Sequence, residues 1–331
     1  MKFRLSYAFL FSIVVLSCSD DLDSVTSDLR LRHKGADMPV WVRGNLGSGK
    51  LILFLHGGPG DCAMCYRYYL EPIEKEFAVA YWDQRNAGSS SGVVDISTLT
   101  YSQFLEDTEL VVKLLRHQYP NTKLYLLGHS FGVELGWQFL TTSQNQDMVD
   151  GFIAVNGTFS SYRWLYNMRE FVLEQSGDHN NTDAKTFAQQ NEVDPENILG
   201  YDWQQLYRYM LDVGGNPVHV LSDKGFVVDY ALNSPNITFG QFANGRHFGN
   251  VTNTDGLTFE KGSLLSNVNI PVGLFWGKKD GVIPYPIAAE TAELLTNTTS
   301  EIVTFDESWH EPFISETDKF IAELKNFVRK N

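Results

Sequence analysis

Gly128-His129-Ser130-Phe131-Gly132 follows an apolar run at 123–127 and precedes a helical pattern at 133–140. A serine between small residues at a strand-to-helix turn is the pattern of a nucleophile elbow. The turn is too tight for a Cβ at either glycine, and the serine takes a strained conformation that exposes its hydroxyl. The following helix would direct backbone N–H groups at an oxyanion formed there. We therefore predict that Ser130 is a nucleophile.

Strand-like and helix-like segments alternate around this turn. Continuous apolar runs predict buried strands at 51–55, 77–82, 124–127 and 151–155. Amphipathic patterns predict helices between them at 66–75 and 104–117. Two alternating segments, 29–33 and 38–43, predict a hairpin at the start of the sheet. Strands that alternate with helices imply right-handed crossovers and a mostly parallel sheet.

This alternation stops after residue 155 and resumes at residue 268. Amphipathic or aromatic-rich segments predict helices within the gap at 162–175, 203–213 and 218–232. The pattern then continues with strands at 271–276 and 301–305 and helices at 286–295 and 314–328. The sequence thus predicts an α/β core over 29–155 and 268–331, with a helical cap inserted over 156–267.

The N-terminus resembles a bacterial lipoprotein signal. Lys2 and Arg4 precede an apolar stretch at 5–16, and a short cleavage-site pattern ends at Cys18. We expect residues 1–17 to be removed, Cys18 to carry a lipid, and residues 18–28 to form a tether. The acidic residues within 19–23 resemble a signal for the outer membrane of the bacterial envelope, with possible surface exposure. An ordinary secretory signal or a short membrane anchor stays open as an alternative.

Composition excludes several classes of protein. The 331 residues are 43% hydrophobic and 20% charged, which is typical of a globular chain and not of a disordered one. The formal net charge of −14 would repel a nucleic acid.

Cys62 and Cys65 form an even pair once Cys18 is lipidated, so a local disulfide is possible. Since no second ligand pair accompanies them, we expect no metal and no cofactor.

A nucleophilic serine needs a base and an acid that orients the base. Asp280 follows the strand predicted at 271–276, and His310 follows the strand predicted at 301–305. Parallel strands bring their carboxyl ends to one edge of the sheet, and the order serine, acid, histidine is that of a nucleophile-elbow enzyme. We therefore predict a triad of Ser130, His310 and Asp280.

Other residues compete for these roles less well. Asp306 and Glu307 lie near His310 in the sequence and remain alternatives for the acid, whereas Asn156 is uncharged and cannot serve. His56 and His129 flank glycine loops, where we expect them to form local hydrogen bonds. The other histidines fall on predicted loops, helix faces or the cap: His33, His117, His179, His219 and His247.

An oxyanion hole needs two N–H donors. One comes from the residue after the nucleophile, here Phe131, and one from the loop after an earlier strand. His56-Gly57-Gly58-Pro59-Gly60 directly follows the strand at 51–55, and its glycines let the backbone approach a substrate oxygen. We predict that the N–H groups of Phe131 and Gly58 form the hole.

Three motifs now carry a resemblance to a family. His56-Gly-Gly-Pro-Gly60, Asp83-Gln-Arg-Asn-Ala-Gly-Ser89 and the serine turn resemble, in this order, the α/β-hydrolase superfamily and its proline iminopeptidase-like branch. The resemblance spans residues 29–330. It implies that Asp83 and Arg85 form a buried or half-buried ion pair. The chain departs from the branch at Asn86, His129 and Phe131, where the family tends to have glycine, glycine and tryptophan.

The resemblance also implies how a substrate is recognised. Iminopeptidases bind a free amine with cap glutamates, one of them in a Trp-Glu pair, because a buried ammonium needs a carboxylate partner. This cap has no Trp-Glu pair. Glu170 and Glu174 lie four residues apart on one helical face and are our candidates for substrate binding, although that spacing also fits a solvated face.

These features predict a serine hydrolase that acts on a peptide or another small molecule through an acyl-enzyme. An aminopeptidase of the proline iminopeptidase type comes first, and a carboxylesterase or lactonase for a small apolar acyl group comes second. A surface-tethered binding protein on a hydrolase scaffold is the alternative of another class, because a fold does not fix a function. The oligomeric state is left open.

Overall fold

The computed structural model describes residues 24–92, 95–217 and 258–331. The predicted signal at 1–17, Cys18, most of the tether and the helix predicted at 218–232 lie outside the described residues, as do His219 and His247. Within the described ranges, no helix is both long and apolar enough to cross a membrane.

The core of the molecule is one nine-stranded sheet with the strand order β1-β2-β4-β3-β6-β7-β8-β9, and the short β5 pairs with β2. All pairings from β4 to β9 are parallel, whereas β1, β2 and β4 pair antiparallel. The strands are β1 (Ser24–His33), β2 (Ala36–Asn45), β3 (Lys50–Leu55), β4 (Ala78–Trp82), β5 (Ser91–Gly92), β6 (Lys123–His129), β7 (Gly151–Val155), β8 (Val272–Gly277) and β9 (Ser300–Phe305). The predicted mostly parallel sheet is confirmed. Its hairpin is longer than predicted, because residues 24–28 pair with β2 and are not part of the tether.

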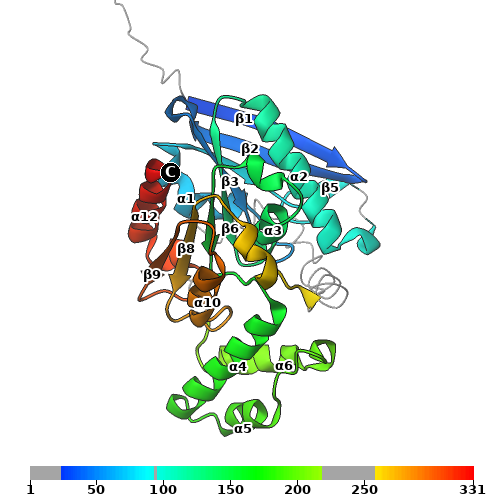
Figure 1. Ribbon diagram of the computed structural model, residues 1–331, viewed down its shortest axis with the longest axis vertical. Helices are drawn as coiled ribbons and strands as arrows, with labels where there is room; N and C mark the ends of the chain where they lie inside the picture. Colours follow the sequence, from blue (N-terminus) through cyan, green and yellow to red (C-terminus); the bar gives the residue numbers. More distant parts are fainter. Residues whose placement is uncertain (1–23, 93–94, 218–257) are drawn as a thin grey trace, which may run out of the picture.

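Helices cover both faces of this sheet (Figure 1). Along β3, Ile52 and Phe54 pack into the apolar cluster that includes α1 and α12, while Leu51 and Leu53 pack into the opposite cluster with α2 and α3. Apolar residues at consecutive positions are therefore required, because each face of the strand is buried. The covering helices are α1 (Arg67–Glu74), α2 (Tyr101–Gln118), α3 (Phe131–Leu140), α10 (Pro286–Leu294), α11 (Pro312–Ser315) and α12 (Thr317–Lys330).

The segment between β7 and β8 contains the helices of the predicted cap. The described ones are α4 (Ser161–Asp178), α5 (Thr182–Gln190) and α6 (Trp203–Asp212), which lie together beyond one end of the sheet (Figure 1). The sequence pattern missed α5, because only Ala184 and Ala188 of this polar helix are fully buried. Side-chain oxygens of Ser160, Asn181 and Asp202 accept backbone N–H groups at the three N-termini and set where the helices begin.

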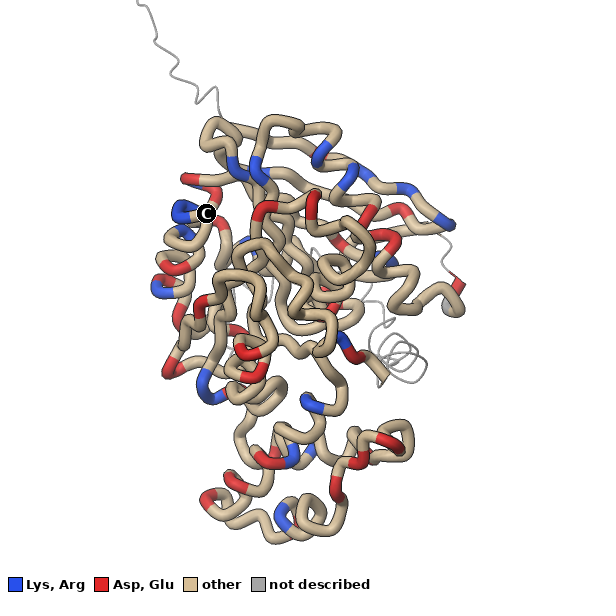
Figure 2. Tube along the Cα trace, in the orientation of Figure 1, with Lys and Arg blue, Asp and Glu red and all other residues tan. Residues whose placement is uncertain are grey.

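Charged residues of both signs are interspersed over the described chain (Figure 2). Basic residues on β1 have acidic partners, since Arg30 and Arg32 both contact the carboxylate of Asp37. Their hydrogen bonds hold the pKa of Asp37 below its usual value. The basic side chains of Arg30 and Arg32 thus share one carboxylate.

The predicted ion pair between Asp83 and Arg85 is wrong, although both side chains are buried. Arg85 instead makes two hydrogen bonds to Asp107 on α2, with Nη2 and Oδ1 2.8 Å apart. The Asp83 carboxylate accepts the backbone N–H groups of Ala63 and Ser89, each at 2.6 Å. Asp83 therefore joins the segment that follows β3 to the segment that follows β4. The sequence could not reveal this exchange, because it depends on how α2 packs against the loop.

Candidate active site

Ser130 lies at the turn between β6 and α3, as predicted. Its φ of 53° and ψ of −120° place it in a strained backbone region. A Cβ on Gly128 would approach the Gly132 carbonyl oxygen to 2.7 Å, and a Cβ on Gly132 would approach the Leu55 oxygen to 2.0 Å. Both glycines are thus required by close backbone contacts, which confirms the reasoning from the sequence.

The glycine loop after β3 packs directly against this turn. A Cβ on Gly57 would lie 3.2 Å from Cβ of Ser130, and Gly58 has a φ of +114° that favours glycine. His56 holds the loop, because its Nδ1–H donates to the Gly57 oxygen at 2.8 Å and its Nε2 accepts the N–H of Gln84 at 3.1 Å. The local bonding predicted for His56 is confirmed. Phe131 is the first residue of α3, so its N–H has no acceptor within the helix.

Asp280 and His310 meet at the carboxyl ends of β8 and β9. His310 Nδ1 lies 2.9 Å from Asp280 Oδ2, and both side chains are buried. Asp280 Oδ1 accepts the N–H groups of Val282 and Ile283 at 2.8 and 3.0 Å. Burial lowers the pKa of His310, but the charge and hydrogen bond of Asp280 outweigh it, so the net shift is upward. The carboxylate fixes the proton on Nδ1 and leaves Nε2 free to act as a base.

The two alternatives for the acid lie elsewhere. Asp306 forms an exposed ion pair with Lys278, and Glu307 forms one with Lys279. Neither carboxylate contacts His310 in the described structure, whereas Asp280 does.

Asn156 has a role that the sequence did not reveal. It is fully buried at the carboxyl end of β7, and its φ of 45° turns the chain sharply. Its Nδ2 donates to Asp280 Oδ2 and, at 3.2 Å, to the Trp309 carbonyl oxygen. Its Oδ1 accepts the N–H of Gly277 at 3.2 Å. One amide therefore holds the acid and both loops that carry the acid and the base.

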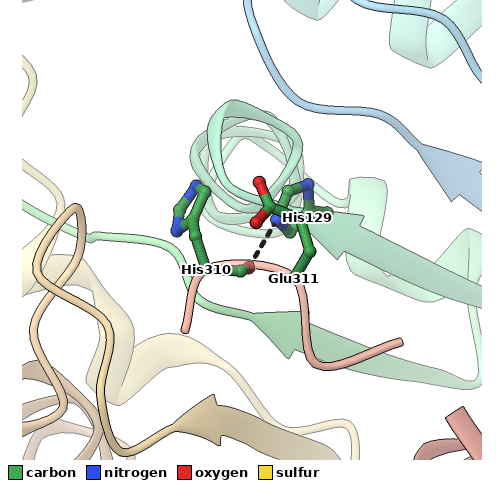
Figure 3. Close-up of side chains that lie close together, drawn as sticks. All are labelled: His129, His310 and Glu311. Atoms are coloured by element: carbon green, nitrogen blue, oxygen red, sulfur yellow. Dashed lines mark hydrogen bonds between the residues drawn. The ribbon is translucent and has the colours of Figure 1, made fainter. Parts of the chain in front are cut away.

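His129, the residue before Ser130, is bonded to the backbone of the predicted base. Its Nε2–H donates to the backbone oxygen of His310 at 2.9 Å, and the two ring centroids lie 4.8 Å apart (Figure 3). Burial, reinforced by the charge of His310, lowers the pKa of His129 well below its usual value. His129 is thus a neutral hydrogen-bond donor, and its partner lies on a distant loop and not in its own.

Glu311 is a half-buried carboxylate that sequence reasoning missed. It follows His310 directly and lies between the two histidines in Figure 3. Donor atoms of His129, His310 and Glu311 all lie within 4.8 Å of one another, as a metal site would require. Each histidine, however, already commits one ring nitrogen to a protein partner. Burial raises the pKa of Glu311 to about 7.

The cap glutamates chosen from the sequence are not buried, unlike Asp280 and His310. Glu170 and Glu174 are both exposed on α4. Glu170 pairs with the neighbouring Arg169, at 2.6 Å between Nη1 and Oε1. Their spacing thus forms a solvated helix face, the second interpretation that the spacing allowed.

The cap is bonded to the loops that carry Asp280 and His310. Trp164 Nε1 of α4 donates to the Val282 oxygen at 2.7 Å, and Gly281 N–H donates to the Gly215 oxygen at 2.8 Å. Trp309 Nε1 donates to the oxygen of Gly214, just beyond α6, at 3.1 Å. Trp164 of α4 and the residues directly after α6 therefore bond to the acid and base loops.

Cys62 and Cys65 are joined by a disulfide in the segment that follows the glycine loop. Both cysteines are fully buried. The disulfide that the sequence left open thus forms in this structure, next to Ala63, which donates to Asp83.

A strained serine after a parallel strand, a buried Asp-His pair after two later strands and an inserted helical cap define an α/β-hydrolase. The family described as alpha/beta hydrolase fold matches residues 50–317, which is most of the chain. The chain belongs to this family and is a hydrolytic enzyme.

Individual relatives are similar along nearly the whole chain. The probable aminopeptidase YbaC of Bacillus subtilis is 27% identical over 300 residues, covering 84% of this chain and 89% of its own. A proline iminopeptidase of Heyndrickxia coagulans is 23% identical over 296 residues, covering 85% and 91%. The crystal structure of a proline iminopeptidase-related protein from Thermus thermophilus superposes with a TM-score of 0.63 at 20% identity, covering 92% and 98%. This structural likeness supports the fold alone.

Proposed function

We propose that this protein is a serine aminopeptidase that releases an N-terminal proline or another apolar residue from peptides. The observation that carries the proposal is the buried His310–Asp280 pair, in which the backbone oxygen of His310 accepts a hydrogen bond from His129, the residue before Ser130. The similarity to a probable aminopeptidase and to a proline iminopeptidase favours a peptide substrate.

In the proposed reaction, Ser130 Oγ attacks the carbonyl carbon of the first peptide bond while His310 Nε2 takes the hydroxyl proton. The N–H groups of Gly58 and Phe131 stabilise the resulting oxyanion. The C–N bond then breaks, His310 returns the proton to the leaving amine, and an acyl-enzyme remains on Ser130. Water attacks the ester with His310 again as base, and the free amino acid leaves with the Ser130 hydroxyl restored. Asp280 remains ionised and stabilises the imidazolium in each half of the cycle.

The Ser130→Ala variant tests the nucleophile. It should lose turnover and labelling by a fluorophosphonate probe while keeping its circular dichroism spectrum and unfolding midpoint. Wild-type labelling separates an enzyme of this type from a binding protein on a hydrolase scaffold. Full activity in the purified variant would remove Ser130 from the mechanism.

Substrate choice separates the peptidase from the esterase. Proline p-nitroanilide and p-nitrophenyl acetate should both be hydrolysed by the wild-type protein, because a serine hydrolase acts on activated esters as well as amides. If the prolyl anilide is inert while short acyl esters turn over, the peptidase proposal fails and the esterase or lactonase function replaces it.

A further inference from the structure

Glu311 occupies an unusual position for a carboxylate. It is the residue after the predicted base, and its side chain lies beside the rings of His310 and His129 (Figure 3). Its side chain accepts a hydrogen bond from Asn216, in the segment that follows α6. The carboxylate therefore lies where the cap segment meets the predicted catalytic loops.

The charges that act on Glu311 are those of His310, when it is protonated, and of two carboxylates. Asp280 and Asp61 both act on it electrostatically, and among the described residues no lysine or arginine forms an ion pair with it. The phenol of Tyr207 on α6 is also within electrostatic range, and its pKa is raised to about 12, chiefly by burial and further by Glu311. A half-buried carboxylate in such surroundings favours a cationic ligand.

Within the described residues, His129 adds a buried nitrogen without a partner to this site. His129 is 2% exposed, and its Nδ1 has no hydrogen-bond partner in the described part of the chain. That nitrogen borders Gly57, because a Cβ there would lie 3.1 Å from it, and Gly57 in turn packs on Ser130. A buried acceptor without a partner is costly. The site is therefore suited to a ligand that supplies N–H donors and positive charge.

An aminoacyl substrate brings such a group to this position. Only the α-carbon separates its ammonium from the carbonyl carbon that Ser130 attacks, so the ammonium must lie near the base as well. We infer that Glu311 binds the free α-ammonium of the substrate and makes the enzyme specific for peptides with an unblocked N-terminus. This inference rests on the proposed aminopeptidase function. It assigns the binding of the substrate amine, which the sequence predicted for Glu170 and Glu174 of the cap, to the loop that carries His310.

The Glu311→Gln variant tests this inference, because it removes the charge and keeps the shape. Proline p-nitroanilide provides the cation, and the p-nitrophenyl ester of cyclopentanecarboxylic acid has the same ring without the nitrogen. We expect the ratio of kcat/KM for the anilide to kcat/KM for the ester to fall roughly 10- to 100-fold, the range for losing a hydrogen bond to a charged group. Glu311→Asp should retain more of the ratio than the glutamine variant.

Glu307→Gln is the matched control, because Glu307 lies on the same loop, carries the same charge and is exposed against Lys279. It should leave the ratio unchanged. The inference would be overturned if the ratio is unchanged in Glu311→Gln, whether or not both activities fall. It would also be overturned if the ratio falls in the double variant Glu170→Gln/Glu174→Gln. If Glu311→Gln does not fold, the pH dependence of KM in the wild-type protein provides the test. Because Glu311 loses its charge below about pH 7, KM for the anilide should rise there while KM for the ester does not. A parallel change of the two KM values would refute the inference.

The failure of this inference differs from the failure of the proposed function. If the wild-type protein turns over the ester but not the anilide, the aminopeptidase function itself is wrong. If it turns over the anilide and the substitution leaves the ratio intact, the function stands and only the assignment of Glu311 falls.

Discussion

Replacing Asn156 by glycine should weaken both the fold and the reaction. Glycine accepts the positive φ of this position, so the change removes the side chain with little backbone strain. Three hydrogen bonds are lost, to Asp280, to the Trp309 oxygen and from the Gly277 N–H. The buried N–H left unpaired costs about 1–3 kcal/mol, and the two acceptors add about 1 kcal/mol each. We expect the free energy of unfolding to fall by roughly 3–5 kcal/mol.

The effect on catalysis should be moderate. Asp280 keeps the N–H donors of Val282 and Ile283 on Oδ1, so the carboxylate still fixes the proton on His310 Nδ1. We therefore expect kcat/KM to fall about 10- to 100-fold. Asp280→Asn should cost about 10⁴-fold, because an amide in that position selects the wrong histidine tautomer.

Urea unfolding followed by tryptophan fluorescence measures the stability, and fluorophosphonate titration gives the active fraction used to normalise kcat/KM. Asn180→Gly is the matched control, since Asn180 also has a positive φ, of 51°, but is exposed on a turn of the cap. It should change stability by less than about 0.5 kcal/mol. Wild-type kcat/KM in a destabilised Asn156→Gly protein would refute the positioning role, and unchanged stability would refute the hydrogen-bond account.

Three further outcomes follow from the structure. The raised pKa of His310 should place the midpoint of the acid limb of kcat/KM above pH 6.5 for a neutral ester, because the base must be unprotonated to accept the serine proton; a midpoint below 6.5 would contradict this. Arg85→Met and Asp107→Asn should each lower the free energy of unfolding by about 3–5 kcal/mol, because each leaves a buried charge unpaired. Urea titration checks this, and the double variant should recover part of the loss. Lastly, we propose that Cys18 anchors the protein to the outer membrane. In a Gram-negative host the Cys18→Ser variant should move from the Triton X-114 detergent phase to the aqueous phase, and the anchor is wrong if partition is unchanged.

Local sequence signals were sufficient for the fold and the core of the site. The glycines around Ser130 are demanded by contacts between a strand and the helix that follows it, so a pentapeptide and its context carry the information. Asp280 and His310 could be chosen because each follows a predicted strand, and parallel strands bring their ends together. Such inferences need only the order of the elements.

Local sequence signals could not predict pairings between side chains that are distant in the sequence. Asn156 was rejected as an acid, correctly, yet its amide bonds Asp280 across 124 residues of chain. Arg85 pairs with Asp107 because α2 packs there, and the nearer Asp83 is used by backbone N–H groups instead. Glu311 directly follows the predicted base in the sequence, but its burial depends on how the segment after α6 packs on this loop. These features arise from packing, and a one-dimensional pattern does not encode them.

A carboxylate next to the base also couples substrate binding to catalysis. The negative charge of Glu311 raises the pKa of His310 in addition to the effect of Asp280, which favours the protonated and inactive form. A bound ammonium would neutralise that charge, lower the pKa of His310 and so favour the neutral base. Because Glu311 is joined to His310 by one peptide bond, movement of the cap cannot separate the two. Recognition of the N-terminus from this loop would therefore lower the pKa of the base when a substrate with a free amine is in place, in addition to the activity that the base shows toward neutral esters.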